Sequence, residues 1–96
     1  MGLLDKESIK KHLSELERWE LKDNAIERHY SFKSYMKSIE FINSLAAIAE
    51  ERNHHPDMVV GWCAVKVSFT SHDKGGVTKQ CFKMANALEK TWLKFS

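Results

Sequence analysis

The residues best suited to chemistry in this 96-residue chain are three histidines, His54, His55 and His72. His54 and His55 stand directly before Pro56, and His72 stands directly before Asp73. The ordinary histidine pKa, near 6.5, lets one ring donate a proton while another accepts one at neutral pH. Two such rings on opposite edges of a small heterocycle could therefore move protons. Spacing alone leaves open the alternative that all three make ordinary surface hydrogen bonds.

The sequence gives little support for a metal site or for a nucleophilic mechanism. Glu50 or Asp73 could complete a zinc site with the histidines. However, adjacent side chains on extended backbone point in opposite directions, so His54 and His55 would rarely bind one ion together. The sequence also lacks the HExxH, paired CxxC and GxSxG motifs and a phosphate-binding glycine loop. We therefore expect acid/base work with no metal and no cofactor.

Composition narrows the classes of partner. The chain has 15 Lys and Arg against 13 Asp and Glu, a formal net charge of +2, and its basic residues are scattered. Nucleic-acid binding normally needs a clustered basic face. Cys63 and Cys81 are too few for a disulfide framework, and no signal peptide or long apolar span is visible. We expect a cytoplasmic protein, with the nucleus as a second candidate compartment, that contacts neither nucleic acid directly nor a membrane.

Hydrophobic periodicity predicts seven elements in the order α-β-β-α-β-β-α. They are a helix near 6–17, a hairpin of 18–22 with 25–32, a helix from Ser34 to Arg52, a hairpin of 57–61 with 64–71, and a last helix after Thr78. Two hairpins, each followed by a helix, predict an α+β fold: a four-stranded antiparallel sheet with three helices on one face. At this length we expect a single domain over 1–96.

Two helices carry apolar stripes. The stripe of the second helix, called here the second-helix stripe, is Tyr35, Ile39, Ile42, Ala46 and Ala49, with Met36 and Leu45 beside it. We expect it to pack in the core rather than to form an exposed interface. The stripe of the last helix is Cys81, Met84, Ala85, Leu88 and Trp92.

The histidines are predicted to lie at the ends of these elements, where loops on a rigid scaffold often carry function. His54 and His55 follow the second helix, and His72 lies between the second hairpin and the last helix. If segments 53–57 and 70–73 lie at the same end of the sheet, the three rings can meet.

The two histidine blocks resemble those of the pterin-4a-carbinolamine dehydratase family. The blocks are Glu50-Glu51-Arg52-Asn53-His54-His55-Pro56 and Thr70-Ser71-His72-Asp73, at the family's spacing. Residues 25–33 resemble the family's second strand, and Trp19 stands where the family has an aromatic residue. The similarity extends from about Trp19 to Trp92. Two positions depart from the pattern, because Met58 stands where Trp is common and Trp62 where Tyr is frequent.

The resemblance implies a lyase, 4a-hydroxytetrahydrobiopterin dehydratase, which removes water from 4a-hydroxytetrahydropterin to give quinonoid dihydropterin in tetrahydrobiopterin recycling. It implies that His54 and His72 are the acid/base pair, in either order, that His55 assists, and that Glu50 orients His54. The residues that it implies for contact with the pterin are Asn53, His54, His55, Pro56, Thr70, Ser71, His72 and Asp73, with Trp19 in the pocket wall.

The resemblance also implies a homodimer or a homotetramer, assembled through helices and sheet edges. Some animal members of the family act as dimerisation cofactors of a homeodomain-type transcription factor. A protein-binding module is therefore the second functional hypothesis, and its candidate surface is the second-helix stripe.

Overall fold

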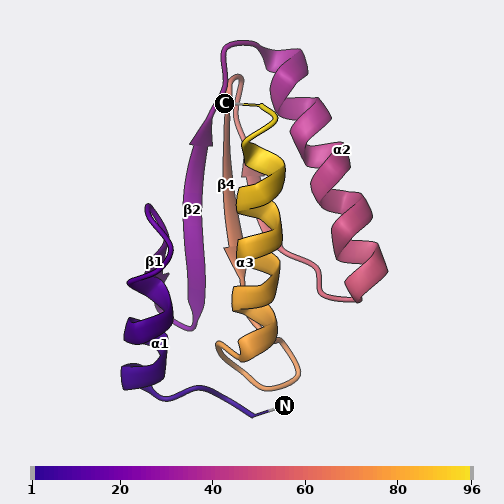
Figure 1. Cartoon of the computed structure of the whole chain (residues 1–96). Coiled ribbons are helices and arrows are strands. Elements are labelled where there is room, and N and C mark those ends of the chain that lie inside the picture. The colour runs from indigo at the N-terminus through magenta and orange to yellow at the C-terminus, as the bar shows by residue number, and fades with distance from the viewer. Residues whose placement is uncertain (1, 96) are drawn as a thin grey trace.

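The computed structural model describes residues 2–95, and its elements follow the predicted order. They are α1 (Lys6–Leu13), β1 (Glu20–Lys22), β2 (Ala25–Ser31), α2 (Tyr35–Arg52), β3 (Asp57–Val60), β4 (Ala64–Phe69) and α3 (Lys79–Trp92). The four strands pair antiparallel in the order β1-β2-β4-β3, and the three helices lie on one side of the sheet (Figure 1). The predicted α+β class is confirmed.

The core is built on the two central strands of the sheet. On β4 the side chains of Val65, Val67 and Phe69 are fully buried, whereas the intervening Lys66 and Ser68 are only half-buried. This alternation is the period of a strand with one covered face. The antiparallel register places Ile26, Arg28 and Tyr30 of β2 opposite Phe69, Val67 and Val65. The helix-covered face is therefore apolar except for one arginine.

The last helix packs on this layer as predicted. Cys81, Met84, Ala85 and Leu88 of α3 are fully buried, and Trp92 is half-buried. Truncating such a buried Leu to Ala typically destabilises a fold by about 2–5 kcal/mol. α3 is thus anchored firmly against β4, and its N-terminal turn is held at one end of the sheet.

The second helix is rotated relative to its predicted orientation. Its buried residues are Ser38, Phe41, Leu45 and Ala49, and Ser38 is accommodated because its hydroxyl donates to the Tyr35 carbonyl at 2.6 Å. The ring of Phe41 packs against Tyr30 and Trp92, at centroid distances of 4.7 and 5.8 Å. This aromatic cluster decides which face of α2 points inward.

The expectation that the second-helix stripe packs in the core was therefore wrong for most of its length. Tyr35 is 48% exposed and Met36 62% exposed. Ala46 is also exposed, and Ile39 and Ile42 are half-buried; only Ala49 and the flanking Leu45 are buried.

The elements are also shorter than predicted, most clearly in α1. This helix ends at Leu13, and the chain then turns through Arg18, whose φ of 70° is in the left-handed region. Leu16 is still buried, but it packs from this turn rather than from a helix. A periodic apolar residue can therefore reach the core without extending the helix.

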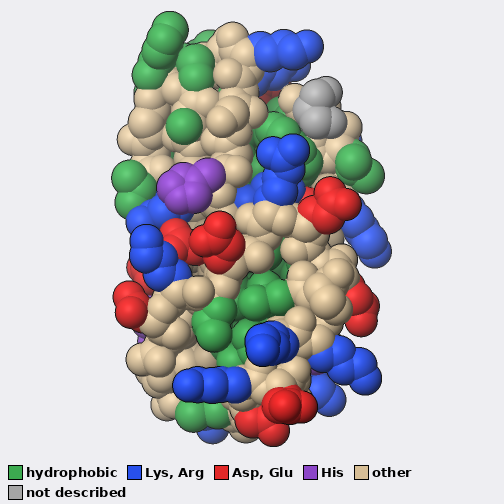
Figure 2. Space-filling model, turned by 90° about the vertical axis from the view of Figure 1, so that its left-hand side faces the viewer, with side chains coloured by type: hydrophobic (Ala, Val, Ile, Leu, Met, Phe, Trp, Pro, Cys, Tyr) green, Lys and Arg blue, Asp and Glu red, His purple; other side chains and the backbone are tan. Residues whose placement is uncertain are grey.

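The surface on the α1 side of the molecule carries both signs of charge. Figure 2 shows acidic and basic side chains interspersed there, with apolar side chains between them. Within the described part of the chain, no helix combines the length and the apolar character needed to cross a bilayer.

Candidate active site

The end of α2 positions the first two histidines. Asn53 closes the helix in the left-handed conformation, φ 49° and ψ 44°, which asparagine adopts more readily than most residues. The backbone N–H of His54 then donates to the Ala49 carbonyl at 3.1 Å. This turn directs the chain back to the sheet and sets His54 and His55 immediately before β3.

The loop between β4 and α3 positions the third histidine. Ser71 and Gly76 form an isolated bridge, with the Ser71 N–H donating to the Gly76 carbonyl at 2.8 Å, and Gly75 adopts a φ of 76°. The Thr70 hydroxyl donates to the Asn24 carbonyl at 2.6 Å. Figure 1 shows that this loop and the end of α2 lie at the same end of the molecule.

Two adjoining cavities open between these segments. The histidine cavity, of about 240 Å³, is lined by Asn53, His54, His55, Thr70, Ser71, His72 and Asp73. The neighbouring cavity, of about 340 Å³, is lined by Asn53, His54, Ser71, Asp73, Lys74, Thr78 and Gln80. The expected meeting of the two histidine segments is confirmed, and most residues that the resemblance implied line this space.

His54 is the most enclosed of the three rings. It is half-buried and stacks on Phe69 with a centroid distance of 6.1 Å, and its Nε2 lies 3.5 Å from the Cys81 sulfur. Burial lowers the pKa of His54 below the ordinary 6.5, and the charges of His72 and His55 lower it further, against the opposing effect of Asp73. The neutral ring is therefore favoured at neutral pH.

The other two rings are exposed and each faces a carboxylate. The His55 and His72 side chains are 52% and 66% exposed. His55 Nε2 contacts the Glu50 carboxylate, and His72 Nε2 lies 3.4 Å from the Asp57 carboxylate. The prediction that Glu50 orients His54 was wrong, because the turn at Asn53 brings His55 over the last turn of α2.

Trp19 lies in the core rather than in the cavity wall. It is 5% exposed, its Nε1 donates to Glu89 at 3.0 Å, and its ring stacks on Phe69 at 5.9 Å. Because Phe69 in turn stacks on His54, Trp19 supports the site from one layer below. Pro56 is half-buried and does not line either cavity.

Sequence reasoning missed the residues that contact the histidines from other elements. Asp57 follows Pro56 directly, so its proximity in sequence was a signal, but its pairing with His72 depends on the register of β3 with β4. Cys81 was predicted only as a core residue of the last helix, and nothing in its spacing indicated a contact with His54.

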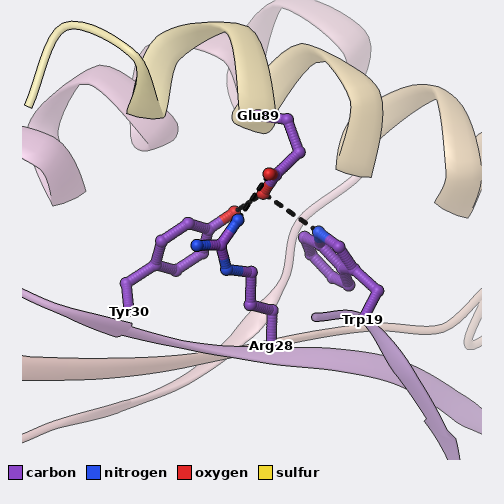
Figure 3. Close-up of polar contacts among 4 residues, drawn as sticks. All are labelled: Trp19, Arg28, Tyr30 and Glu89. Atoms are coloured by element: carbon purple, nitrogen blue, oxygen red, sulfur yellow. Dashed lines mark hydrogen bonds and ion pairs between the residues drawn. The ribbon is translucent and has the colours of Figure 1, made fainter. Parts of the chain in front are cut away.

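A second polar cluster was also missed; its Trp19, Arg28 and Tyr30 are buried, and its Glu89 side chain is 26% exposed. Glu89 of α3 accepts from Trp19 Nε1, from the Tyr30 hydroxyl at 2.5 Å and from Arg28, with which it forms an ion pair (Figure 3). The Arg28 guanidinium lies 4.2 Å from the centroid of the Tyr30 ring. The sequence did contain a signal for this cluster, because strand alternation puts Arg28 on the same face as the apolar Ile26 and so predicts a buried arginine that needs a partner. We call these four residues the Glu89 cluster.

The fold and site together define a small α+β protein with a histidine-lined cavity at one end of its sheet. Among residues 2–95, no three His, Cys, Asp or Glu side chains converge in an arrangement suited to a metal ion. The metal-free character of the site stays a prediction. The model of the family described as pterin 4 alpha carbinolamine dehydratase matches residues 2–91, and the chain belongs to this family.

Curated relatives and solved structures agree with this family. A protein of Sulfolobus acidocaldarius, named "putative pterin-4-alpha-carbinolamine dehydratase", is 36% identical over 91% of this chain and 96% of its own length. A protein of the same name from Koribacter versatilis is 41% identical over 81% of this chain and 83% of its own length.

Two solved structures share the fold. A transcriptional coactivator/pterin dehydratase from Brucella melitensis superposes with a TM-score of 0.90 at 28% identity, over 94% of this chain and 98% of that one. A pterin dehydratase-like RuBisCO assembly factor of the alpha-carboxysome superposes with a TM-score of 0.64 at 21% identity, over 77% of this chain and 86% of that one. The second of these shows the fold alone.

Proposed function

We propose that the protein is a hydro-lyase, 4a-hydroxytetrahydrobiopterin dehydratase, that acts in tetrahydrobiopterin recycling. The observation that carries the proposal is that three imidazoles from two separate segments line one open cavity. Membership of the pterin dehydratase family supports the pterin as substrate class.

The reaction needs one acid and one base on the same edge of the pterin. The acid protonates the 4a-hydroxyl group, the C4a–O bond breaks and water leaves. The base takes the proton from N5, whose electron pair forms the new N5–C4a double bond. Solvent then takes the proton from the base and gives a proton to the acid, so both groups are restored and no cofactor is consumed.

His54 is the proposed base and His72 the proposed acid. The lowered pKa of His54 leaves its ring neutral at neutral pH, which a base requires. His72 Nε2 lies 3.4 Å from the Asp57 carboxylate, and this contact can hold the ring in position to donate a proton. His72 is also exposed, so solvent can return its proton. Positioned acid/base groups of this kind typically contribute about 10²–10⁴ in rate.

The remaining lining residues would hold the ring. His55, steadied by Glu50, can contact the pterin from the open side. Asn53 and Asp73 present polar groups to both cavities. The hydroxyls of Thr70 and Ser71 already bond the Asn24 carbonyl and Thr78, so they shape the loop.

A stopped-flow dehydratase assay tests the activity directly. The substrate is 4a-hydroxytetrahydropterin generated in the same mixture, and formation of quinonoid dihydropterin is followed by absorbance. The expected result is dehydration faster than the spontaneous reaction, in proportion to protein concentration. Spontaneous rates in the presence of folded protein would contradict the proposal.

The second candidate function is a protein-binding module. The exposed part of the second-helix stripe, with Tyr35 48% and Met36 62% exposed, presents apolar side chains that a partner helix or a second copy of the chain could cover. A homodimer or homotetramer would use such a surface, and a transcription-factor dimerisation segment would compete for it. Sedimentation of the wild type and of Met36→Glu tests this, because a stripe-mediated oligomer dissociates in the variant. An unchanged oligomeric state would contradict the use of this surface.

A further inference from the structure

Cys81 is a fully buried thiol in the first turn of α3, and the proposed reaction gives it no role. Its sulfur lies 3.5 Å from Nε2 of His54. The hydroxyl oxygens of Ser71 and Thr78 lie 3.7 and 3.9 Å from the same sulfur and 2.7 Å from each other. The sulfur therefore joins a buried pair of hydroxyls to the most enclosed ring of the site.

This contact makes the two nitrogens of His54 different. Nε2 points to Cys81 in the interior, while the ring lines both cavities, so Nδ1 is the nitrogen left for a ligand. A neutral imidazole carries a single N–H, and the partner of one nitrogen decides the state of the other. The residue at position 81 can therefore control what His54 offers to a substrate.

We propose that Cys81 is a positioning residue whose sulfur accepts the Nε2–H of His54 and so keeps the lone pair of Nδ1 toward the substrate. The catalytic consequence rests on the proposed function, because only a base needs that lone pair. The arrangement leaves the S–H of Cys81 with acceptors of its own. The Cys81 S–H can donate to the hydroxyl of Ser71 or Thr78, and those two hydroxyls bond each other.

The other charged groups that act on His54 come from two segments. His55 is its neighbour in the chain, and His72 and Asp73 lie in the loop between β4 and α3. They change the cost of charging the ring, whereas Cys81 contacts one ring nitrogen. Two different measurements therefore follow the tautomer and the charge of His54.

Nitrogen-15 NMR of the labelled full chain, at a pH where His54 is neutral, reads the tautomer. The expected wild-type result is a proton on Nε2. In Cys81→Ala the acceptor for Nε2–H is lost, so a mixture of the Nε2–H and Nδ1–H tautomers should appear. Cys81→Ser should restore the Nε2–H form, because a hydroxyl oxygen also accepts a hydrogen bond.

The pH profile of dehydratase activity supplies the second readout. A lost acceptor destabilises the imidazolium more than the neutral ring, so the pKa of His54 falls in Cys81→Ala. The acid limb of activity should then move down by up to about half a pH unit, with lower activity on the plateau. Leu88→Ala is the matched control, since Leu88 is fully buried on the same helix. The Leu88→Ala variant should have a lower melting temperature, with the His54 tautomer and the acid limb of the pH profile unchanged.

Two results overturn the proposal. One is the observation that His54 of the wild type carries its proton on Nδ1; this test does not depend on the folding of any variant. The other is a folded Cys81→Ala with an unchanged tautomer and an unchanged acid limb. If the wild type has no dehydratase activity, the proposed function fails, but the NMR result still decides the role of Cys81.

Discussion

The two polar clusters of this molecule, the Glu89 cluster and the histidine cavity, are built in opposite ways. In the Glu89 cluster, Arg28 is 6% and Tyr30 0% exposed, and three donors converge on one carboxylate. At the histidine cavity, the His55 and His72 side chains are 52% and 66% exposed and pair with exposed carboxylates.

This difference indicates that the Glu89 cluster stabilises the fold and that the histidine cavity carries the chemistry. A buried charge is tolerated only when it is paired and hydrogen-bonded, so the groups of the Glu89 cluster are committed to one another. The exposed imidazoles keep contact with solvent and with an open cavity, so they can exchange protons and meet a ligand. We therefore expect changes in the first cluster to affect folding and changes in the second to affect turnover.

Glu89→Ala should give the largest effect. It leaves Arg28 buried without its partner, and the free energy of unfolding should fall by about 3 kcal/mol. Urea denaturation measures this, with Lys90→Ala, exposed on the same helix, as the control. Activity per folded molecule should change little. A loss below about 1 kcal/mol would contradict the structural role of the cluster.

His54→Ala and His72→Ala should reverse this pattern. Each should lower kcat/KM by about 10–10³-fold, because a proton-transfer group is removed. The free energy of unfolding should change by less than about 1 kcal/mol. His29→Ala is the matched control, since His29 is exposed on β2. Wild-type activity in either site variant would refute its assignment.

Glu50→Gln should have a smaller effect on the same site. It removes the carboxylate charge that steadies His55, and exposed ion pairs contribute little. We expect a loss in kcat/KM of less than about fivefold, measured against Glu51→Gln, its exposed neighbour. A loss as large as that of His54→Ala would mean that Glu50 takes part in the chemistry itself.

The pH dependence of stability should give the smallest effect. The pKa of His54 is lowered in the folded protein, so below the ordinary value of 6.5 the unfolded chain binds a proton that the folded ring resists. Its contribution to stability is present above pH 6.5 and is lost as the pH falls through the window between 6.5 and the lowered value. The urea midpoint of the wild type should therefore fall relative to that of His54→Ala as the pH drops through that window, whereas a relative rise would contradict the sign.

The order of elements could be predicted from the sequence because periodicity reports which residues alternate between core and solvent. The rotation of α2 could not, because apolar residues cover a broad part of that helix and more than one face could have turned inward. Phe41 decides between them by packing on Tyr30 and Trp92, two rings distant in sequence. A contact of that kind is a property of the tertiary structure.

The site shows the same limit. The histidine blocks and their meeting place could be predicted, since motif and loop position are local. The partners of the rings could not, because Glu50 reaches His55 through the turn at Asn53 and Cys81 reaches His54 from another helix. Trp19 was expected in the cavity wall and lies one layer deeper, behind Phe69.

A crystal structure of the protein with a bound dihydropterin tests the central claim most directly. The account predicts the ring in the histidine cavity, with a nitrogen of His54 and a nitrogen of His72 each within about 3.2 Å of the C4a–N5 edge, or one water away. A pterin bound elsewhere, or one whose C4a–N5 edge faces away from both imidazoles, would contradict it.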